Sequence, residues 1–128
     1  MSVFDHQRLD VYQRSIDFVA LAEEVINHLP RGRSYIADQL RRPAASIALN
    51  IAEGAGEFSP TDKARLYRIA RRSATECAAI LDICERLELA SRDHFAPAHG
   101  MLQEIIAMLV LLIRACEGRG RGKGRGRG

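Results

Sequence analysis

The feature that most constrains the fold is a stretch from Ser59 to about Ala90 that contains no helix breaker after its first turn. Ser59 and Pro60 are typical of a helix start, as an N-cap and a first helical residue. Apolar residues then recur at alternating spacings of three and four, which is the spacing of a coiled-coil seam: Tyr67, Ala70, Ala74, Cys77, Leu81 and Cys84. A helix of roughly 30 residues would span about 45 Å. Because such a helix gains most of its stability by packing, we expect a helical bundle.

Breakers divide the rest of the chain into three more helices. We expect the four helices at about residues 10–29, 34–53, 60–90 and 94–117. Pro30 and Gly32 end the first helix, Ser34 is the expected N-cap of the second, and Gly54 ends the second. Pro43 lies inside the second helix and is expected to bend it without dividing it.

The last predicted helix is apolar nearly all round. Residues 105–113 read IIAMLVLLI, and this apolar run of nine is shorter than the roughly 20 residues that span a bilayer. We therefore expect a buried helix and no membrane partner. Because a bundle of four helices leaves an outer face on each of them, a helix this apolar also predicts self-association.

Short connections between long helices favour an all-α, up-down-up-down antiparallel four-helix bundle over residues 1–117. Residues 118–128, GRGRGKGRGRG, are low in complexity and predict a disordered Arg/Gly-rich tail. The tail has four Arg, one Lys and no acid, whereas residues 1–117 hold 14 basic and 16 acidic residues, a net charge of −2. The net charge of +3 of the whole chain is therefore a property of the tail.

Length and cysteine usage indicate one domain in a reducing compartment. The 128 residues are enough for one hydrophobic core. The three cysteines, Cys77, Cys84 and Cys116, contain no C-x-x-C pair and are odd in number, so we expect buried, reduced thiols and a cytoplasmic location. The first ten residues contain charges and no apolar stretch, which predicts no signal peptide.

The enzyme motifs that spacing can test are absent. The sequence contains no G-x-S-x-G and no H-E-x-x-H, and its Gly122-Lys123 pair lacks the Ser or Thr of a P-loop. No glutamate has a histidine three residues later, as a di-iron bundle requires. The histidines fall near predicted helix ends, where we expect solvated or capping roles rather than metal binding: His6, His28, His94 and His99. We therefore expect no enzymatic activity, no cofactor and no metal.

Polar residues lie beside the apolar stripes of the second and third predicted helices. They are Gln39, Ser46, Asn50, Glu53, Ser73 and Glu76. Since buried polar groups must be paired, we expect a hydrogen-bond network between the two helices that fixes their register. The alternative is a catalytic or ligand-binding site built from Glu53 and Glu76.

Four segments of the sequence resemble one family, the four-helix bundle proteins encoded in intervening sequences of bacterial 23S ribosomal RNA genes, also known as S23 proteins. The segments are Leu9-Asp10-Val11-Tyr12-Gln13, Gln39-Leu40-Arg41-Arg42, Ser46-Ile47-Ala48-Leu49-Asn50-Ile51-Ala52-Glu53-Gly54 and Ala70-Arg71-Arg72-Ser73-Ala74-Thr75-Glu76. The resemblance covers about residues 4–115, and S-I-x-x-N-I-A-E-G is its most specific element.

This resemblance implies an antiparallel four-helix bundle that assembles as a ring-shaped homopentamer without established enzymatic activity. The family is similar to the accessory variability protein of diversity-generating retroelements, a basic pentamer that binds nucleic acid and a reverse transcriptase. Two features of this chain depart from the pattern: residues 1–117 are slightly acidic, and the Arg/Gly tail has no counterpart.

Basic residues indicate two candidate surfaces for RNA or DNA. Arg65, Arg68 and Arg72 share one face of the third predicted helix, and five charges in the tail would contact phosphates without sequence preference. The full candidate set is Arg41, Arg42, Lys63, Arg65, Arg68, Arg71, Arg72, Arg119, Arg121, Lys123, Arg125 and Arg127. The competing interpretations are a solvated helix face paired with local acids such as Asp62 and Glu76, and a tail that only adds solubility.

The sequence therefore predicts a cytoplasmic homo-oligomer that binds nucleic acid non-specifically or acts as an adaptor for another protein. The alternative is a structural scaffold without nucleic-acid affinity, whose partner covers the outer face of the fourth helix.

Overall fold

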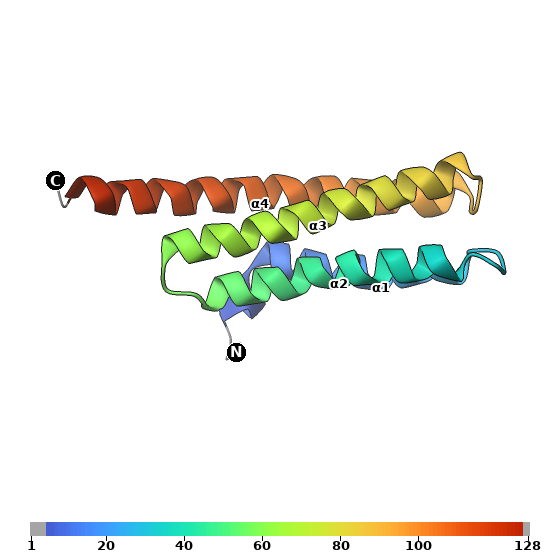
Figure 1. The fold of residues 1–128 in the computed structure, drawn as a ribbon, viewed down its shortest axis with the longest axis horizontal. Coiled ribbons are helices and arrows are strands. Elements are labelled where there is room, and N and C mark those ends of the chain that lie inside the picture. Colours follow the sequence, from blue (N-terminus) through green and yellow to red (C-terminus); the bar gives the residue numbers. More distant parts are fainter. Residues whose placement is uncertain (1–4, 127–128) are drawn as a thin grey trace.

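In the computed structural model the chain forms an antiparallel up-down-up-down bundle of four α-helices (Figure 1). The structure describes residues 5–126, without the side chains of residues 7, 8 and 120–126. The elements are the 3₁₀ turn η1 (Asp5–Arg8), α1 (Asp10–Asn27), α2 (Ser34–Gly56), α3 (Pro60–Arg86) and α4 (Arg92–Gly126). Each helix packs on its neighbours in sequence and α1 closes the bundle against α4, while the backbones of the diagonal helices do not approach closely within the described residues. The predicted fold class is confirmed.

The helix ends follow from local chemistry. Ser59 has an extended backbone (φ −73°, ψ 129°), and its Oγ accepts a hydrogen bond from the Asp62 amide at 3.3 Å, so the predicted cap of α3 is confirmed. The predicted cap of α2 is displaced by one position, because Ser34 is the first helical residue and Arg33 is the N-cap. α2 continues through the buried Pro43 as one helix, as expected.

The seam of α3 lies at the centre of the core. All six seam residues that the sequence predicts are buried, with exposed fractions between 0 and 3%. The three cysteines are also buried and reduced, as predicted. Burial raises the pKa of the Cys77 thiol to about 12, so this side chain is protonated and behaves as a small apolar group.

The last turn of α2 approaches α3 closely because residue 54 is glycine. A Cβ atom at Gly54 would lie 2.7 Å from Cε1 and 2.9 Å from Cδ1 of Tyr67. The Tyr67 ring, only 3% exposed, therefore packs directly on the α2 backbone. The glycine of the S-I-x-x-N-I-A-E-G element thus has a packing role.

α4 buries one face and leaves the other uncovered. Leu102, Ile105, Leu109 and Cys116 are 0 to 1% exposed, whereas Leu111 is 65% exposed. By length and composition, α4 between Arg92 and Arg119 is the one helix in the described chain that could cross a membrane, a test that core helices also pass. Only 28% of its most apolar 18-residue window is buried in the bundle, so the expected buried helix is buried on one side.

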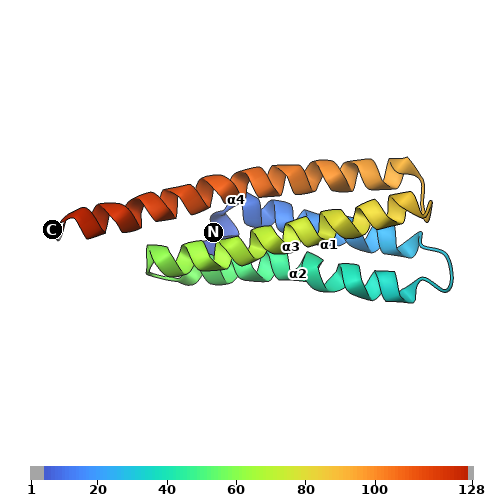
Figure 2. The same ribbon diagram turned by 45° about the horizontal axis from the view of Figure 1, so that its top comes forward.

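The structure extends α4 beyond the predicted end at Glu117. Residues 118–126 are helical rather than the predicted disordered tail, and residues 127–128 lie outside the described residues. Lengthening an existing helix adds a hydrogen bond for each residue fixed and needs no new nucleus, so glycines alone do not end α4. Figures 1 and 2 show this extension projecting past the connection between α2 and α3.

We predict that Gly54→Ala destabilises the fold and that Gly56→Ala does not. The added methyl group at residue 54 overlaps the Tyr67 ring, so the free energy of unfolding should fall by about 1–3 kcal/mol. A Cβ at Gly56, two residues away, meets nothing within 4 Å, and alanine there should be neutral or stabilise the helix by up to about 1 kcal/mol. Urea unfolding of the two variants measures both effects, and equal stabilities would contradict the proposed packing.

Candidate nucleic-acid interface

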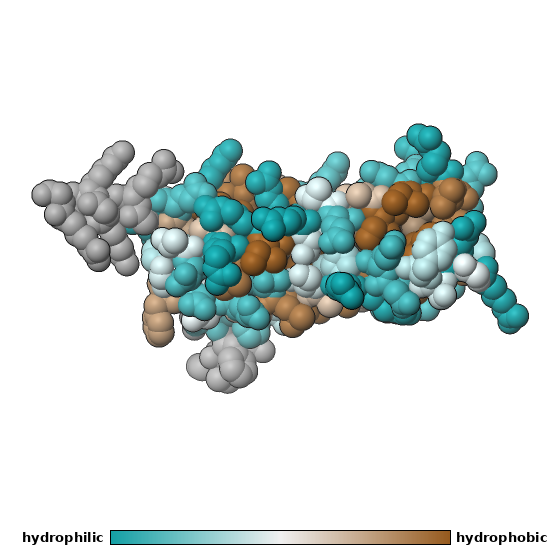
Figure 3. Space-filling model, viewed as in Figure 1, coloured by the Kyte–Doolittle hydropathy of each residue, from teal (hydrophilic) through white to brown (hydrophobic). Residues whose placement is uncertain are grey.

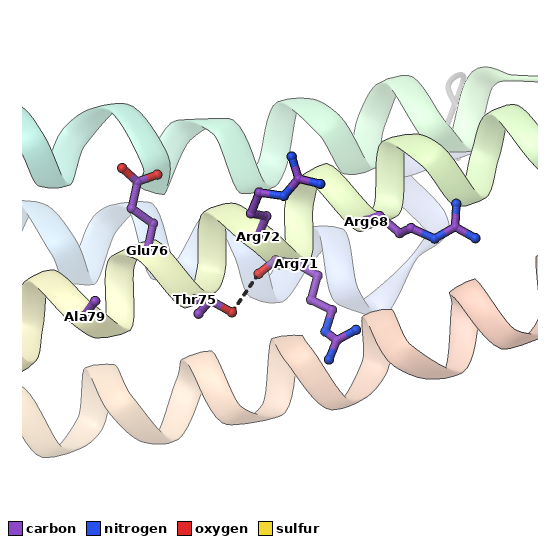
Figure 4. Close-up of a pocket in the computed structure, with 6 residues that line it drawn as sticks. All are labelled: Arg68, Arg71, Arg72, Thr75, Glu76 and Ala79. Carbon is purple, nitrogen blue, oxygen red and sulfur yellow. Dashed lines mark hydrogen bonds between the residues drawn. The ribbon is translucent and has the colours of Figure 1, made fainter.

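The outward face of α3 carries a hollow of about 680 Å³ lined by arginines (Figure 4). Its lining residues are Arg68, Arg71, Arg72, Thr75, Glu76 and Ala79. Their spacing along a single helix places them on one face, opposite the buried seam. Figure 4 shows Arg72 and Glu76 directed toward α2, whereas Arg71 is directed toward α4.

Two arginines of this hollow are exposed and have no ion-pair partner among the described residues. They are Arg71 and Arg72, and the exposed Arg65, about two turns earlier, is also without such a partner. The expected alternative, pairing of this face with Asp62 and Glu76, is not found in the described chain. These guanidinium groups are therefore available to an external anion.

Two other arginines from the predicted nucleic-acid-binding set form ion pairs between helices of the bundle. Arg68 Nη2 lies 2.7 Å from Glu117 Oε1 and joins α3 to α4. Arg41 Nε lies 3.0 Å from Glu23 Oε1 and joins α2 to α1. Because these side chains are about half exposed, each ion pair contributes only about 0–1 kcal/mol to stability. The paired acids also reduce the positive charge that a nucleic acid would meet at these two arginines.

Lys63 caps the C-terminal end of α2. Its half-buried ammonium donates hydrogen bonds to the carbonyl oxygens of Gly54 at 3.1 Å and Ala55 at 2.9 Å. Carbonyls at a helix C-terminus lack intrahelical partners and attract cations. The structure therefore gives Lys63 a stabilising role at the end of α2.

Arg42 lies beside acids rather than within the arginine cluster. It lines a second hollow of about 460 Å³ together with Asp38, Gln39, Glu76 and Ile80. Glu76 borders both hollows and separates the basic face of α3 from this mixed surface. On one protomer the arginines of α3 thus form a compact cluster, and acids separate it from Arg42 on α2.

The basic residues of the tail continue along α4. Arg119 Nη2 donates to Cys116 Sγ at 3.3 Å. The side chains of Arg121, Lys123 and Arg125 are outside the described part of the structure, as is the whole of Arg127.

Three of the six predicted polar residues form the network between α2 and α3. Ser73 Oγ donates to Ser46 Oγ at 2.9 Å. Asn50 Nδ2 donates to Ser46 Oγ at 3.0 Å and to the Ser46 carbonyl oxygen at 2.8 Å. Ser73 is buried and the other two residues are partly buried, so hydrogen bonds within the group satisfy polar atoms that have limited access to water.

The remaining three predicted members, Gln39, Glu53 and Glu76, are exposed and do not join the network. Their longer side chains start near the same stripe but extend into solvent. Ser46 and Ser73 meet across the antiparallel α2 and α3. Glu53 and Glu76 lie in opposite directions from this pair, ten residues or about 15 Å apart along the bundle, so they do not form the close pair that catalysis would require.

Comparison with known proteins gives one family and one fold. A family model described as 23S rRNA-intervening sequence protein matches residues 7–111. A solved structure of a protein of unknown function from the S23 ribosomal protein family of Bacteroides thetaiotaomicron superposes with a TM-score of 0.75 at 24% identity. That match covers 80% of this chain and 97% of the other, and it shows a shared fold. No curated protein matches the chain.

We predict that Lys63→Met lowers stability and that Arg65→Met leaves it unchanged. Methionine keeps the apolar stem but removes the donors to the two α2 carbonyls, which should cost about 0.5–2 kcal/mol. Arg65, two residues further along α3, is exposed and has no ion pair with a described residue. Chemical unfolding compares the variants, and a fully stable Lys63→Met protein would show that the cap contributes nothing.

Proposed function

This chain belongs to the family of 23S rRNA-intervening sequence proteins, and we propose that it is a non-enzymatic homo-oligomer that binds the phosphate backbone of RNA or DNA. The observation that supports this proposal most directly is the arginine-lined hollow on α3. Arg71 and Arg72 have exposed side chains without a described acidic partner, on the face of α3 that points away from the core.

The chemistry of the hollow suits phosphate and not bases. A guanidinium group donates two parallel hydrogen bonds to a phosphate, and its charge is permanent. Because Arg71 and Arg72 diverge toward opposite sides of α3 (Figure 4), they would contact different phosphates. The six lining residues include no aromatic ring on which a base could stack. We therefore infer binding without sequence preference.

The extension of α4 supplies the second contact in this proposal. Residues 1–117 have a net charge of −2, so the bundle as a whole gives a polyanion no net attraction. Four of the five basic residues of the tail lie in the part of α4 that projects beyond the bundle (Figure 1), namely Arg119, Arg121, Lys123 and Arg125. Nucleic acid would thus be held at the α3 hollow and along the α4 extension.

We also propose that a second copy of the chain covers the apolar face formed by α4 and the start of α1. A hollow of about 260 Å³ on this face is lined by Leu9, Val11, Met108, Leu111 and Leu112, with Asp10 as its single charged residue. A surface with one acid and no base gives little electrostatic basis for a charged partner. Closed assembly of identical chains, such as the pentamer that the family resemblance implies, would repeat the α3 arginines around the particle and multiply the phosphate contacts.

A structural scaffold or protein adaptor without nucleic-acid affinity is the competing function. It would use the same apolar face, so only nucleic-acid binding distinguishes the two.

We predict salt-dependent binding of a fluorescently labelled single-stranded RNA of roughly 20 nucleotides, which exceeds the usual site of one domain. Each phosphate neutralised on a single strand adds about 0.7 to the slope of log K against log salt concentration. The double variant Arg71→Ala/Arg72→Ala should therefore lower the slope by about 1 to 1.5. Neutralising the five basic tail residues with glutamine should lower it by up to about 3.5. Fluorescence anisotropy at several salt concentrations gives these slopes.

The matched control removes two positive charges from arginines outside the α3 hollow. Arg14 and Arg41 are engaged with Glu104 at 2.7 Å and Glu23 at 3.0 Å, so Arg14→Ala/Arg41→Ala should leave the slope unchanged. If the wild-type protein does not bind at low salt, the scaffold function is favoured. If both double variants lose the same affinity, net charge and not the α3 hollow determines binding.

We predict that Leu111→Glu dissociates the oligomer and that Leu49→Glu does not. The two leucines are similarly exposed, at 65% and 62%, but Leu111 lies on the proposed interface and Leu49 lies on α2. A charge buried between copies without a partner is strongly unfavourable. Sedimentation velocity of both variants reports the particle mass, and an intact oligomer with Leu111→Glu would place the interface elsewhere.

A further inference from the structure

Asp82, Glu85 and His99 bring three ligand atoms of metal-binding type together at the end of the bundle where α3 is connected to α4. The His99 Nε2 atom lies 3.5 Å from Asp82 Oδ1 and 4.0 Å from Glu85 Oε2. All three ligand atoms lie within 4.8 Å of one another. We propose that these residues bind one divalent transition-metal ion of the Zn²⁺ type. The site is independent of the proposed nucleic-acid interface.

The geometry requires only side-chain adjustment to accept an ion. Metal–ligand bonds of about 2.1 Å in a tetrahedral shell place the ligand atoms about 3.4 Å apart. The His99–Asp82 distance of 3.5 Å already matches this spacing, and the widest separation must close by no more than about 1.4 Å. The Asp82 and Glu85 side chains are 72% and 50% exposed, so rotations about their own bonds supply this movement.

The charges at this end of α3 favour a cation. Asp82 and Glu85 occupy the last two turns of α3, which ends at Arg86. A helix C-terminus carries partial negative charge, which makes two carboxylates there unfavourable. Within the described residues neither carboxylate forms an ion pair with Lys or Arg, and His99 is the partner of both. A neutral imidazole would leave two negative charges for a divalent ion to compensate.

A hollow beside the three residues leaves room for the other ligands of the ion. It measures about 240 Å³ and is lined by Glu85, Arg92, Phe95, Ala96, His99, Gly100 and Gln103. At about 30 Å³ for each water molecule, this volume holds several waters. Three protein ligands with open positions are typical of an accessible metal centre and not of a closed structural one. Arg92 is the one lining group whose charge opposes a metal ion.

The ligand set selects the class of ion. One imidazole nitrogen with two carboxylates suits Zn²⁺, Co²⁺ or Ni²⁺, whereas Mg²⁺ and Ca²⁺ prefer oxygen alone. Because the ligands come from both α3 and α4, a bound ion would hold the two helices together beside their connection and stabilise the folded chain.

Isothermal titration calorimetry of the full-length protein with Zn²⁺ tests the site, with Mg²⁺ as the control ion. We expect one Zn²⁺ for each chain and no measurable Mg²⁺ binding. Loss of an outer-shell partner alone typically weakens metal binding by about 10–100-fold, so His99→Ala, Asp82→Asn and Glu85→Gln should each weaken Zn²⁺ binding at least about tenfold. Visible absorption of the Co²⁺ complex should show the same loss.

His94→Ala is the matched control. His94 belongs to the same helix but lies against His28, with a distance of 4.0 Å between ring centroids, so this variant should bind Zn²⁺ as the wild-type protein does. The two carboxylate variants alter exposed side chains and keep the test valid if His99→Ala does not fold. Wild-type affinity in Asp82→Asn and Glu85→Gln, loss of binding in His94→Ala, or absence of Zn²⁺ binding by the wild-type protein would each overturn the proposal.

Discussion

The packing of α3 between α2 and α4 is the interaction on which the rest of the structure depends. These two contacts are the most extensive in the bundle, and they use a seam of mostly small residues that are at most 3% exposed. Small side chains let the helices approach closely, as the contact between Gly54 and the Tyr67 ring shows. Because a helix that buries one face must present the other, the same seam directs Arg71 and Arg72 outward. One helix therefore sets both the core and the candidate binding surface.

Periodicity predicted the parts of the fold that depend on single helices. The seam of α3, its Ser59 cap and the continuous α2 through Pro43 follow from spacing and local chemistry. Periodicity places a residue on a face of its helix but does not show which side chain it meets there, so the predicted polar network included the exposed Gln39 beside the partly buried Ser46. Composition likewise predicted a disordered tail where the structure continues α4 to Gly126.

The pairing of charges could not be predicted from the sequence. Arg68 and Glu117 are 49 positions apart and meet only because α4 runs back along α3. Lys63 reaches the end of α2 only because the connection between α2 and α3 is short. Thus a set of basic residues that looks uniform in sequence separates into structural residues and a small exposed cluster. His99 is a similar case, since its carboxylate neighbours lie on another helix.

The proposed nucleic-acid surface on α3 and the proposed self-association face on α4 depend on each other. Within the described residues a single protomer offers two exposed arginines without an ion pair in the α3 hollow, and repetition through the apolar face of α4 would turn this pair into an array. Native mass spectrometry of the wild-type protein, with and without the labelled RNA, tests this link most directly. We predict one particle whose mass is a fixed multiple of 14.2 kDa and which gains a single RNA without changing its number of chains. A 14.2 kDa monomer that binds RNA alone, or an oligomer that binds none, would contradict it.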